Sequence, residues 1–212
     1  QVMGMFGMSS PGTTLTSFLA NYLYGFLMLI FPLLYAVIAS NRLVARHVDR
    51  GSMAYLLASP NSRRRVVMTQ MVVLLSGLTF LVFFYTVLGI VCSELWFPDE
   101  LEIGRFILVN VGVYCLHLAL SGLCFFASCA SNESKYAIAI GAGFPLFFYL
   151  VHMLANMGGK LEKLKYATFF TLFDSTALAA GKTSAMIGCA FLAAILLYAV
   201  GCITFCKRDL PL

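Results

Sequence analysis

The sequence predicts an all-α, polytopic membrane protein with five transmembrane helices in this chain. Hydrophobic residues make up 61% of the 212 residues and charged residues only 11%, whereas soluble domains carry about 25% charged residues. Long apolar runs recur five times between polar connections, and about 20 apolar residues in a row are enough to cross a bilayer as a helix. We therefore expect residues 1–212 to form one transmembrane domain.

The first two spans are predicted at about residues 18–40 and 66–91. Pro32 lies inside the first span and is expected to kink it, because proline has no backbone N–H to donate. Residues 1–17 are rich in Met, Gly, Ser and Thr and are predicted to be a loop. They lack the positively charged opening of a signal peptide.

The other three spans are predicted at about residues 106–130, 136–157 and 185–206. Pro145 lies in the middle of the fourth span. The connection over residues 158–184 is partly apolar, but it is too short and too interrupted for a confident span. We interpret it as a candidate re-entrant or interfacial helix.

A polar segment from Arg42 to Arg65 joins the first two spans and carries a strong excess of positive charge. It contains the pattern of a short amphipathic helix over about residues 49–59. Asp49 and Ser52 are candidates to cap its N-terminus, since a short side-chain oxygen accepts free backbone N–H groups there. Pro60 is expected to end it, because proline disfavours helical geometry in the residue before it.

Met53, Leu56 and Leu57 fall on one face of this amphipathic helix, and Tyr55 lies beside them. A helix that lies at the membrane surface and is joined to two spans can transmit force from a soluble partner. The other interpretation is a solvated loop whose arginines only fix the orientation of the chain. These residues alone leave both interpretations open.

The distribution of charge predicts the topology. If the Arg42–Arg65 segment is cytoplasmic, nine Lys and Arg residues and three acidic residues lie inside, against five Lys and Arg residues and six acidic residues outside. Lys and Arg near span ends favour the cytoplasmic side, so the C-terminus and the amphipathic helix are expected there. Five spans then place Gln1 outside, and we expect an additional N-terminal part with a sixth span in the complete protein.

The chain carries no pattern of an enzyme or a metal site. Its seven cysteines lie mostly in apolar runs and do not group into a four-ligand set. A nucleophile with a positioned base and a pair of carboxylates are both missing. AAGKTS, residues 179–184, resembles the end of a phosphate-binding loop, but Thr176 occupies the place where such a loop needs glycine. We expect no ATP and no metal on this chain.

Three polar side chains lie within the spans, namely Asn110, His117 and His152. Hydrocarbon offers such groups no partner, so they form hydrogen bonds between helices or line a substrate path. The spans have no deeply placed acidic or basic residue, which argues against transport coupled to ions or protons. Small residues on the fourth span are expected to allow close helix contact: Ala137, Ala139, Gly141 and Gly143.

DRGSMAYLLASPNSRRRVV, residues 49–67, resembles the cytoplasmic segment of ABC-2 type transporter permeases, in which an acidic-Arg-Gly opening leads to Leu-Leu, Ser-Pro and Ser-Arg-Arg. FCKRDLPL, residues 205–212, is similar to the Lys-Arg-Asp-Leu-Pro ending of many of these permeases. LFD, residues 172–174, is a weaker third match. The order and spacing of the spans agree over the whole chain, counted from the second span of the family.

This resemblance implies a non-enzymatic permease that exports a substrate while separate ABC ATPase subunits, which bind ATP and Mg²⁺, supply the energy. It implies two permease subunits per pump, as a homodimer or a heterodimer. The amphipathic helix would be the coupling helix that contacts the ATPase. The corresponding site residues are Asp49, Arg50, Gly51, Tyr55, Leu56, Leu57, Ser59, Pro60, Arg63 and Arg64.

A second functional hypothesis is a non-transporting scaffold, immunity or sensor protein that binds a partner ATPase without moving cargo. For a permease, aromatic and Met-rich spans suggest an apolar or amphipathic cargo, although the same side chains suit contact with lipid. The net charge of +5 follows the topology rather than a nucleic-acid surface, and we expect no nucleic-acid partner.

Overall fold

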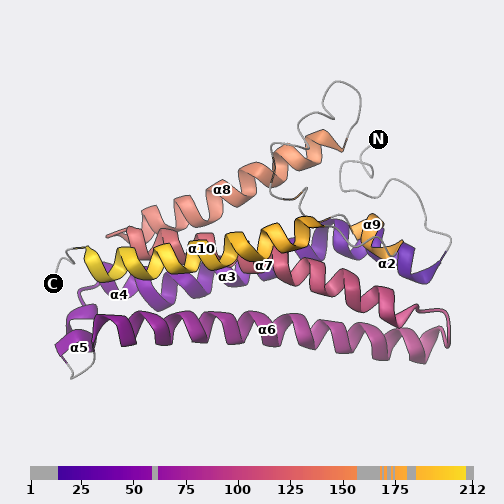
Figure 1. The fold of residues 1–212 in the computed structure, drawn as a ribbon, viewed down its shortest axis with the longest axis horizontal. Helices are drawn as coiled ribbons and strands as arrows, with labels where there is room; N and C mark the ends of the chain where they lie inside the picture. The colour runs from indigo at the N-terminus through magenta and orange to yellow at the C-terminus, as the bar shows by residue number, and fades with distance from the viewer. Residues whose placement is uncertain are drawn as a thin grey trace.

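The computed structural model describes residues 14–58, 62–156, 168, 170, 173, 175–180 and 185–208. In this part of the chain every regular element is a helix, and five helices are long and apolar enough to cross a membrane. They form an elongated bundle with their axes roughly along its length (Figure 1). The all-α class and the five spans are therefore confirmed.

The first spanning helix is continuous from Leu15 to Asp49 and contains two π-helical turns. Its successive parts are α2 (Leu15–Tyr22), η1 (Leu23–Leu27), α3 (Met28–Ser40), η2 (Asn41–Ala45) and α4 (Arg46–Asp49). Thr14 caps the start, since its Oγ1 accepts a hydrogen bond from the Ser17 backbone N–H at 3.2 Å. The helix runs nine residues past the predicted span end at Ser40, because backbone hydrogen bonding continues where the side chains change from apolar to charged.

A tight turn separates this helix from α5 (Met53–Ala58). The predicted range of 49–59 was longer, and Asp49 is instead the last residue of α4. The Ser52 hydroxyl lies 2.9 Å from His47 Nδ1, so this side chain contacts the preceding helix. Ser59 and Pro60 lie outside the described residues.

The longest helix is α6 (Arg63–Trp96), with 34 residues. At 1.5 Å per residue it extends about 50 Å, so it projects beyond a hydrocarbon core of about 30 Å. Ser62 caps its start by accepting a hydrogen bond from the Arg65 N–H at 3.3 Å. Only 17% of the residues in the most apolar part of α6 are buried, which places this helix at the periphery of the bundle.

The central helix is α7 (Ile103–Ala130). In its most apolar part, 67% of the residues are buried. It packs most extensively against α10 (Ala185–Lys207) and also contacts α3 and α8 (Ser134–Ala155). The short helix α9 (Ser175–Ala179) packs on α7 in the predicted connection between the last two spans. Along its length α8 diverges from the other long helices (Figure 1).

The two ends of the bundle differ in charge. We call the end that carries α4, α5, the α7–α8 turn and the C-terminus of α10 the basic end; these elements lie together in Figure 1. Its described residues include nine Lys and Arg residues but only Asp49 and Glu133 as acidic residues. At the opposite end, around the α6–α7 turn, Arg105 stands among four acidic residues. The basic and the acidic residues of the described chain are therefore separated along the bundle axis, as the sequence predicts.

Candidate functional site

The helix α5 presents two faces with different environments. Met53 is 1% exposed, whereas Tyr55 is 83% exposed. Leu56 is partly buried and packs against the same apolar cluster as Met53. Residues 53 and 56 lie three positions apart and share a helix face, and residue 55 points elsewhere. Tyr55 is therefore exposed to the surroundings, while Met53 packs α5 against the bundle.

Met53 belongs to an apolar cluster that brings five segments of the chain together. The other buried members come from η2 and α4, from α6, from α7 and from α10: Val44, Val48, Val67, Leu74, Phe125, Cys129, Tyr198 and Phe205. Because protein interiors are densely packed, displacement of one member forces its neighbours to move. The cluster therefore packs α5 against four other parts of the bundle.

The turn before α5 depends on Gly51, whose φ is +67°. The Gly51 N–H donates to the Val48 carbonyl at 3.0 Å, and the Ala54 N–H donates to the Gly51 carbonyl at 3.1 Å. A Cβ at Gly51 would meet no atom within 4 Å. Glycine is favoured here because of its backbone conformation, since other residues lose roughly 1–2 kcal/mol in the left-handed region.

Arg208 connects the C-terminal ends of α7 and α10 with the beginning of α6. Its guanidinium donates hydrogen bonds to the Cys129 carbonyl at 2.7 Å and to the Ser131 carbonyl at 3.0 Å. The Arg63 guanidinium donates to the Arg208 carbonyl at 3.0 Å. A cation at the end of α7 also interacts favourably with the helix dipole. Partial burial lowers the pKa of Arg208, but an arginine stays charged at neutral pH.

Asn110 makes a buried polar contact between the first helix and α7. The Tyr24 hydroxyl donates to Asn110 Oδ1 at 2.7 Å, and Asn110 Nδ2 donates to the Phe106 carbonyl at 2.8 Å. Asn110 is 3% exposed and Tyr24 is 1% exposed. The two side chains satisfy each other in an apolar region, where an unpaired polar group is costly.

His117 joins α7 to α3 in a similar way. It is fully buried; its Nε2 lies 2.9 Å from the Leu29 carbonyl oxygen and its Nδ1 lies 2.8 Å from the Val113 carbonyl oxygen. A neutral imidazole carries one N–H and donates to only one of these carbonyls. His152 lies apart in sequence on α8, half-buried, with its ring centroid 5.9 Å from that of Phe170.

An apolar groove of about 550 Å³ lies between α6, α7 and α10. Met68 and Met71 line one wall, and Phe191 and Ile195 line another. The Tyr114 hydroxyl in this groove is hydrogen-bonded to Thr79 Oγ1 at 2.8 Å. The groove therefore presents an almost entirely apolar surface to whatever lies against it.

Sequence reasoning missed several contacts that depend on tertiary packing. The Ser121 and Tyr198 hydroxyls lie 2.8 Å apart in a buried contact between α7 and α10. The predicted small-residue face of α8 is used only in part, because Ala137 and Gly141 are buried while Ala139 and Gly143 are not. The packing partners of these residues depend on how each helix is rotated about its axis, which composition does not encode.

Among the described residues, no group of three His, Cys, Asp or Glu side chains could hold a metal ion. All seven cysteines are free thiols. Residues 181–184 of the AAGKTS segment lie outside the described part of the chain, as do Asp209 to Leu212. The side chain of Leu57 lies outside it too.

Five membrane-spanning helices and a short helix anchored at one basic end define a multi-pass membrane protein. The family model described as "ABC-2 family transporter protein" matches residues 1–210. The chain belongs to this family and is a membrane permease of an ABC transporter. Comparison with curated proteins gives no match, and comparison with solved structures gives none either.

Proposed function

We propose that this permease exports a substrate and that α5 is its contact with separate ATPase subunits on the cytoplasmic side. The exposure of Tyr55 next to the buried Met53 is the observation that carries the proposal. Tyrosine is enriched among residues that dominate binding energy at interfaces, because it supplies a large apolar area with few rotatable bonds. The proposed contact residue Tyr55 is thus exposed on a helix that Met53 attaches to the bundle.

The orientation follows from charge. The basic end carries nine of the described Lys and Arg residues, and Lys and Arg accumulate on the cytoplasmic side of membrane proteins. Arg64 is exposed near α5 in the sequence and can form part of a polar rim around Tyr55. The proposed orientation places this surface in the compartment where ATP is hydrolysed.

The movement proposed for transport begins at α5. A closing ATPase pair would push on Tyr55, and the Met53 cluster would pass the displacement to α6, α7 and α10. The Arg63–Arg208 contact ties the start of α6 to the end of α10 and opposes their separate motion. We propose that two permease subunits move together in this way to alternate access to a central path.

Tyr55→Ala tests the ATPase contact. Tyr55 is 83% exposed, so its truncation removes partner contacts without opening a cavity in the bundle. A hot-spot tyrosine contributes about 2 kcal/mol or more, which corresponds to a roughly 30-fold loss of affinity. Pull-down of the full-length protein with its ATPase, followed by titration of the purified components, measures this loss.

Trp96→Ala is the matched control, because Trp96 is 78% exposed and lies at the end of α6 away from α5. It should leave ATPase affinity unchanged. Met53→Ala should retain binding but weaken the link between ATP hydrolysis and transport in reconstituted vesicles. Equal ATPase affinity of wild type and Tyr55→Ala would refute the proposed contact, and binding without any transport would favour the scaffold hypothesis.

A further inference from the structure

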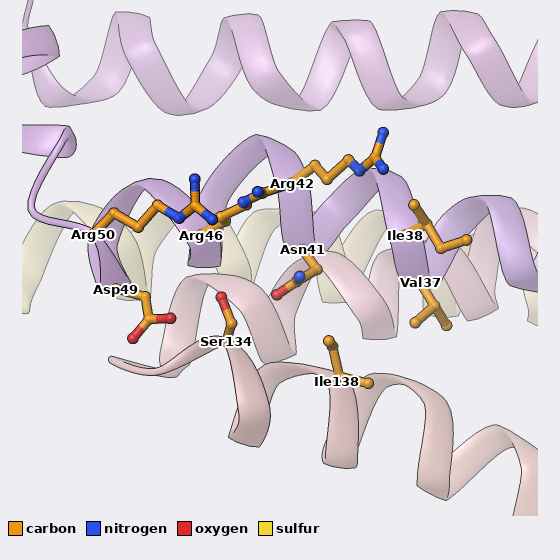
Figure 2. Close-up of a pocket in the computed structure, with 9 residues that line it drawn as sticks. All are labelled: Val37, Ile38, Asn41, Arg42, Arg46, Asp49, Arg50, Ser134 and Ile138. Carbon is orange, nitrogen blue, oxygen red and sulfur yellow. The ribbon is translucent and has the colours of Figure 1, made fainter.

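A second pocket lies at the basic end, between the first helix and α8, and has a volume of about 350 Å³. Figure 2 shows Asn41 and Asp49 on the side of the first helix that faces Ser134, with three arginine side chains extending along that helix. The lining residues are Val37, Ile38, Asn41, Arg42, Arg46, Asp49, Arg50, Ser134 and Ile138. The pocket is separate from the exposed face of α5.

The charge of this pocket favours an anion. Arg42, Arg46 and Arg50 follow each other at intervals of four residues, and Asp49 is the one acidic side chain in the lining. A π-helical turn at Asn41–Ala45 interrupts the α spacing after Arg42, but all three arginine side chains line the same pocket. Among the described residues none of these three arginines has an ion-pair partner. Their planar N–H groups match the geometry of phosphate oxygens.

The start of α8 adds further donors to the pocket. Ser134 is the first residue of α8, and Glu133 before it makes no side-chain capping hydrogen bond. The first N–H groups of a helix lack partners within the helix and attract phosphate. The Ser134 Oγ and Asn41 Oδ1 atoms are also buried without a hydrogen-bond partner in the described structure. The Ser134 hydroxyl can donate to an anionic oxygen, whereas Asn41 Oδ1 only accepts and would take a hydrogen bond from a hydroxyl group of a ligand.

The part of the pocket toward the middle of the two helices is apolar. Ile38 is 51% exposed and Ile138 is 43% exposed, and both lie toward the membrane-spanning parts of their helices. Val37 completes this wall. A ligand that fills the pocket therefore has a negative group at the arginine end and a hydrocarbon chain at the isoleucine end.

We propose that this pocket binds the phosphate of an anionic phospholipid headgroup, with an acyl chain along Ile38 and Ile138. Basic pockets between transmembrane helices are suited to such headgroups. An inorganic phosphate or an acidic segment of a protein shares the charge but not the hydrocarbon chain. Asp49 and Arg50 line this pocket and also belong to the residues predicted for the ATPase contact, so the test uses Arg42, Arg46 and Ser134, which do not.

The test is lipid binding to the purified full-length chain, followed by native mass spectrometry with phosphatidylglycerol and with phosphatidylcholine of the same acyl chains. We expect tighter binding of phosphatidylglycerol by the wild type. The double variant Arg42→Gln/Arg46→Gln should lose at least tenfold in affinity for phosphatidylglycerol, and Ser134→Ala about threefold. Lys135→Gln is the matched control, because Lys135 is exposed beside the pocket and pairs with Glu133 at 2.6 Å.

Three results would overturn the proposal. The first is unchanged phosphatidylglycerol affinity in both the double variant and Ser134→Ala, with all proteins monodisperse and equally stable. The second is displacement of the lipid by inorganic phosphate or by glycerol phosphate at millimolar concentration, which would assign the pocket to a soluble anion. The third is a loss of ATPase co-purification in Arg42→Gln/Arg46→Gln with lipid binding intact, which would assign the arginines to a protein contact.

Discussion

At the residue scale, Arg208 illustrates how a charge that marks the membrane boundary can also hold helices together. Its guanidinium satisfies two carbonyls at the end of α7, and its own carbonyl accepts a hydrogen bond from Arg63. Both carbonyls belong to residues that are buried. An unsatisfied buried carbonyl costs free energy, and hydrogen bonds to charged groups are stronger than neutral ones.

Arg208→Gln should therefore lower the free energy of unfolding by about 2 kcal/mol. This corresponds to a fall of about 4–8 °C in the midpoint of thermal unfolding for a chain of this size. Scanning fluorimetry of the purified protein in detergent measures the shift. Lys207→Gln, at the exposed neighbouring residue, should change the midpoint by less than about 1 °C because surface substitutions have small effects.

The sequence identified the residue types of the buried polar contacts but not their partners. The sequence places Asn110 and His117 within a span and predicts either interhelical hydrogen bonds or a substrate path. Their partners are Tyr24 in η1 and the Leu29 carbonyl in α3, and this pairing depends on how the first helix is rotated against α7. Arg208 belongs to the C-terminal segment that resembles the family, but its hydrogen bonds depend on where α7 ends in space.

At the element scale, the contact between α7 and α10 depends on glycine. A Cβ at Gly201 would lie 3.1 Å from the Phe125 ring and 3.3 Å from the Phe126 Cα, which cannot yield without moving the backbone. Gly122 on the facing helix is similarly close to Leu197 and to the Ala194 carbonyl. The most extensive contact of the bundle is thus set by the absence of side chains at two positions.

Gly201→Leu should force α10 away from α7 and lower the free energy of unfolding by about 1–3 kcal/mol, the usual cost of overpacking. Gly188→Leu on the same helix is the control, since a Cβ there would meet no atom within 4 Å. Thermal unfolding monitored by size-exclusion chromatography compares the two variants. Equal midpoints for Gly201→Leu and wild type would contradict the close approach of the helices.

The first two spanning helices are longer than the spans predicted from hydropathy. The apolar runs located all five spans, but the first helix continues to Asp49 and α6 begins at Arg63 and ends at Trp96. Hydropathy marks the part of a helix that lies in hydrocarbon, whereas the helix itself ends where backbone hydrogen bonding ends. The short α5 was predicted from its spacing of apolar residues, but the break before it requires Gly51 and not a capping Asp49.

At the scale of the whole molecule, the separation of charge between the two ends predicts one orientation. The described basic residues lie mainly with α4, α5 and the end of α10, and the acidic residues lie around the α6–α7 turn. The number of spans between these regions agrees with this separation, because each crossing brings the chain to the other end. The sequence was sufficient for this prediction, since it depends on span order and charge and not on packing.

Cysteine labelling checks the orientation in intact cells. In a background with the seven native cysteines replaced, Arg64→Cys should be protected from a membrane-impermeant maleimide, and Glu100→Cys should react. Both positions are exposed, so both should react after permeabilisation. Reaction of Arg64→Cys in sealed cells would reverse the orientation and remove α5 from the compartment of the ATPase.

The π-helical turn η2 at Asn41–Ala45 has a consequence for everything that follows it in the first helix. A π turn closes with one residue more than an α turn, and each residue of an α-helix advances the side chains by about 100° around the axis. Without that extra residue, α4 would be rotated by about this angle around the helix axis, and Val48 would turn away from the cluster that holds Met53. This one π turn therefore decides which face of α4 meets the cluster that anchors α5.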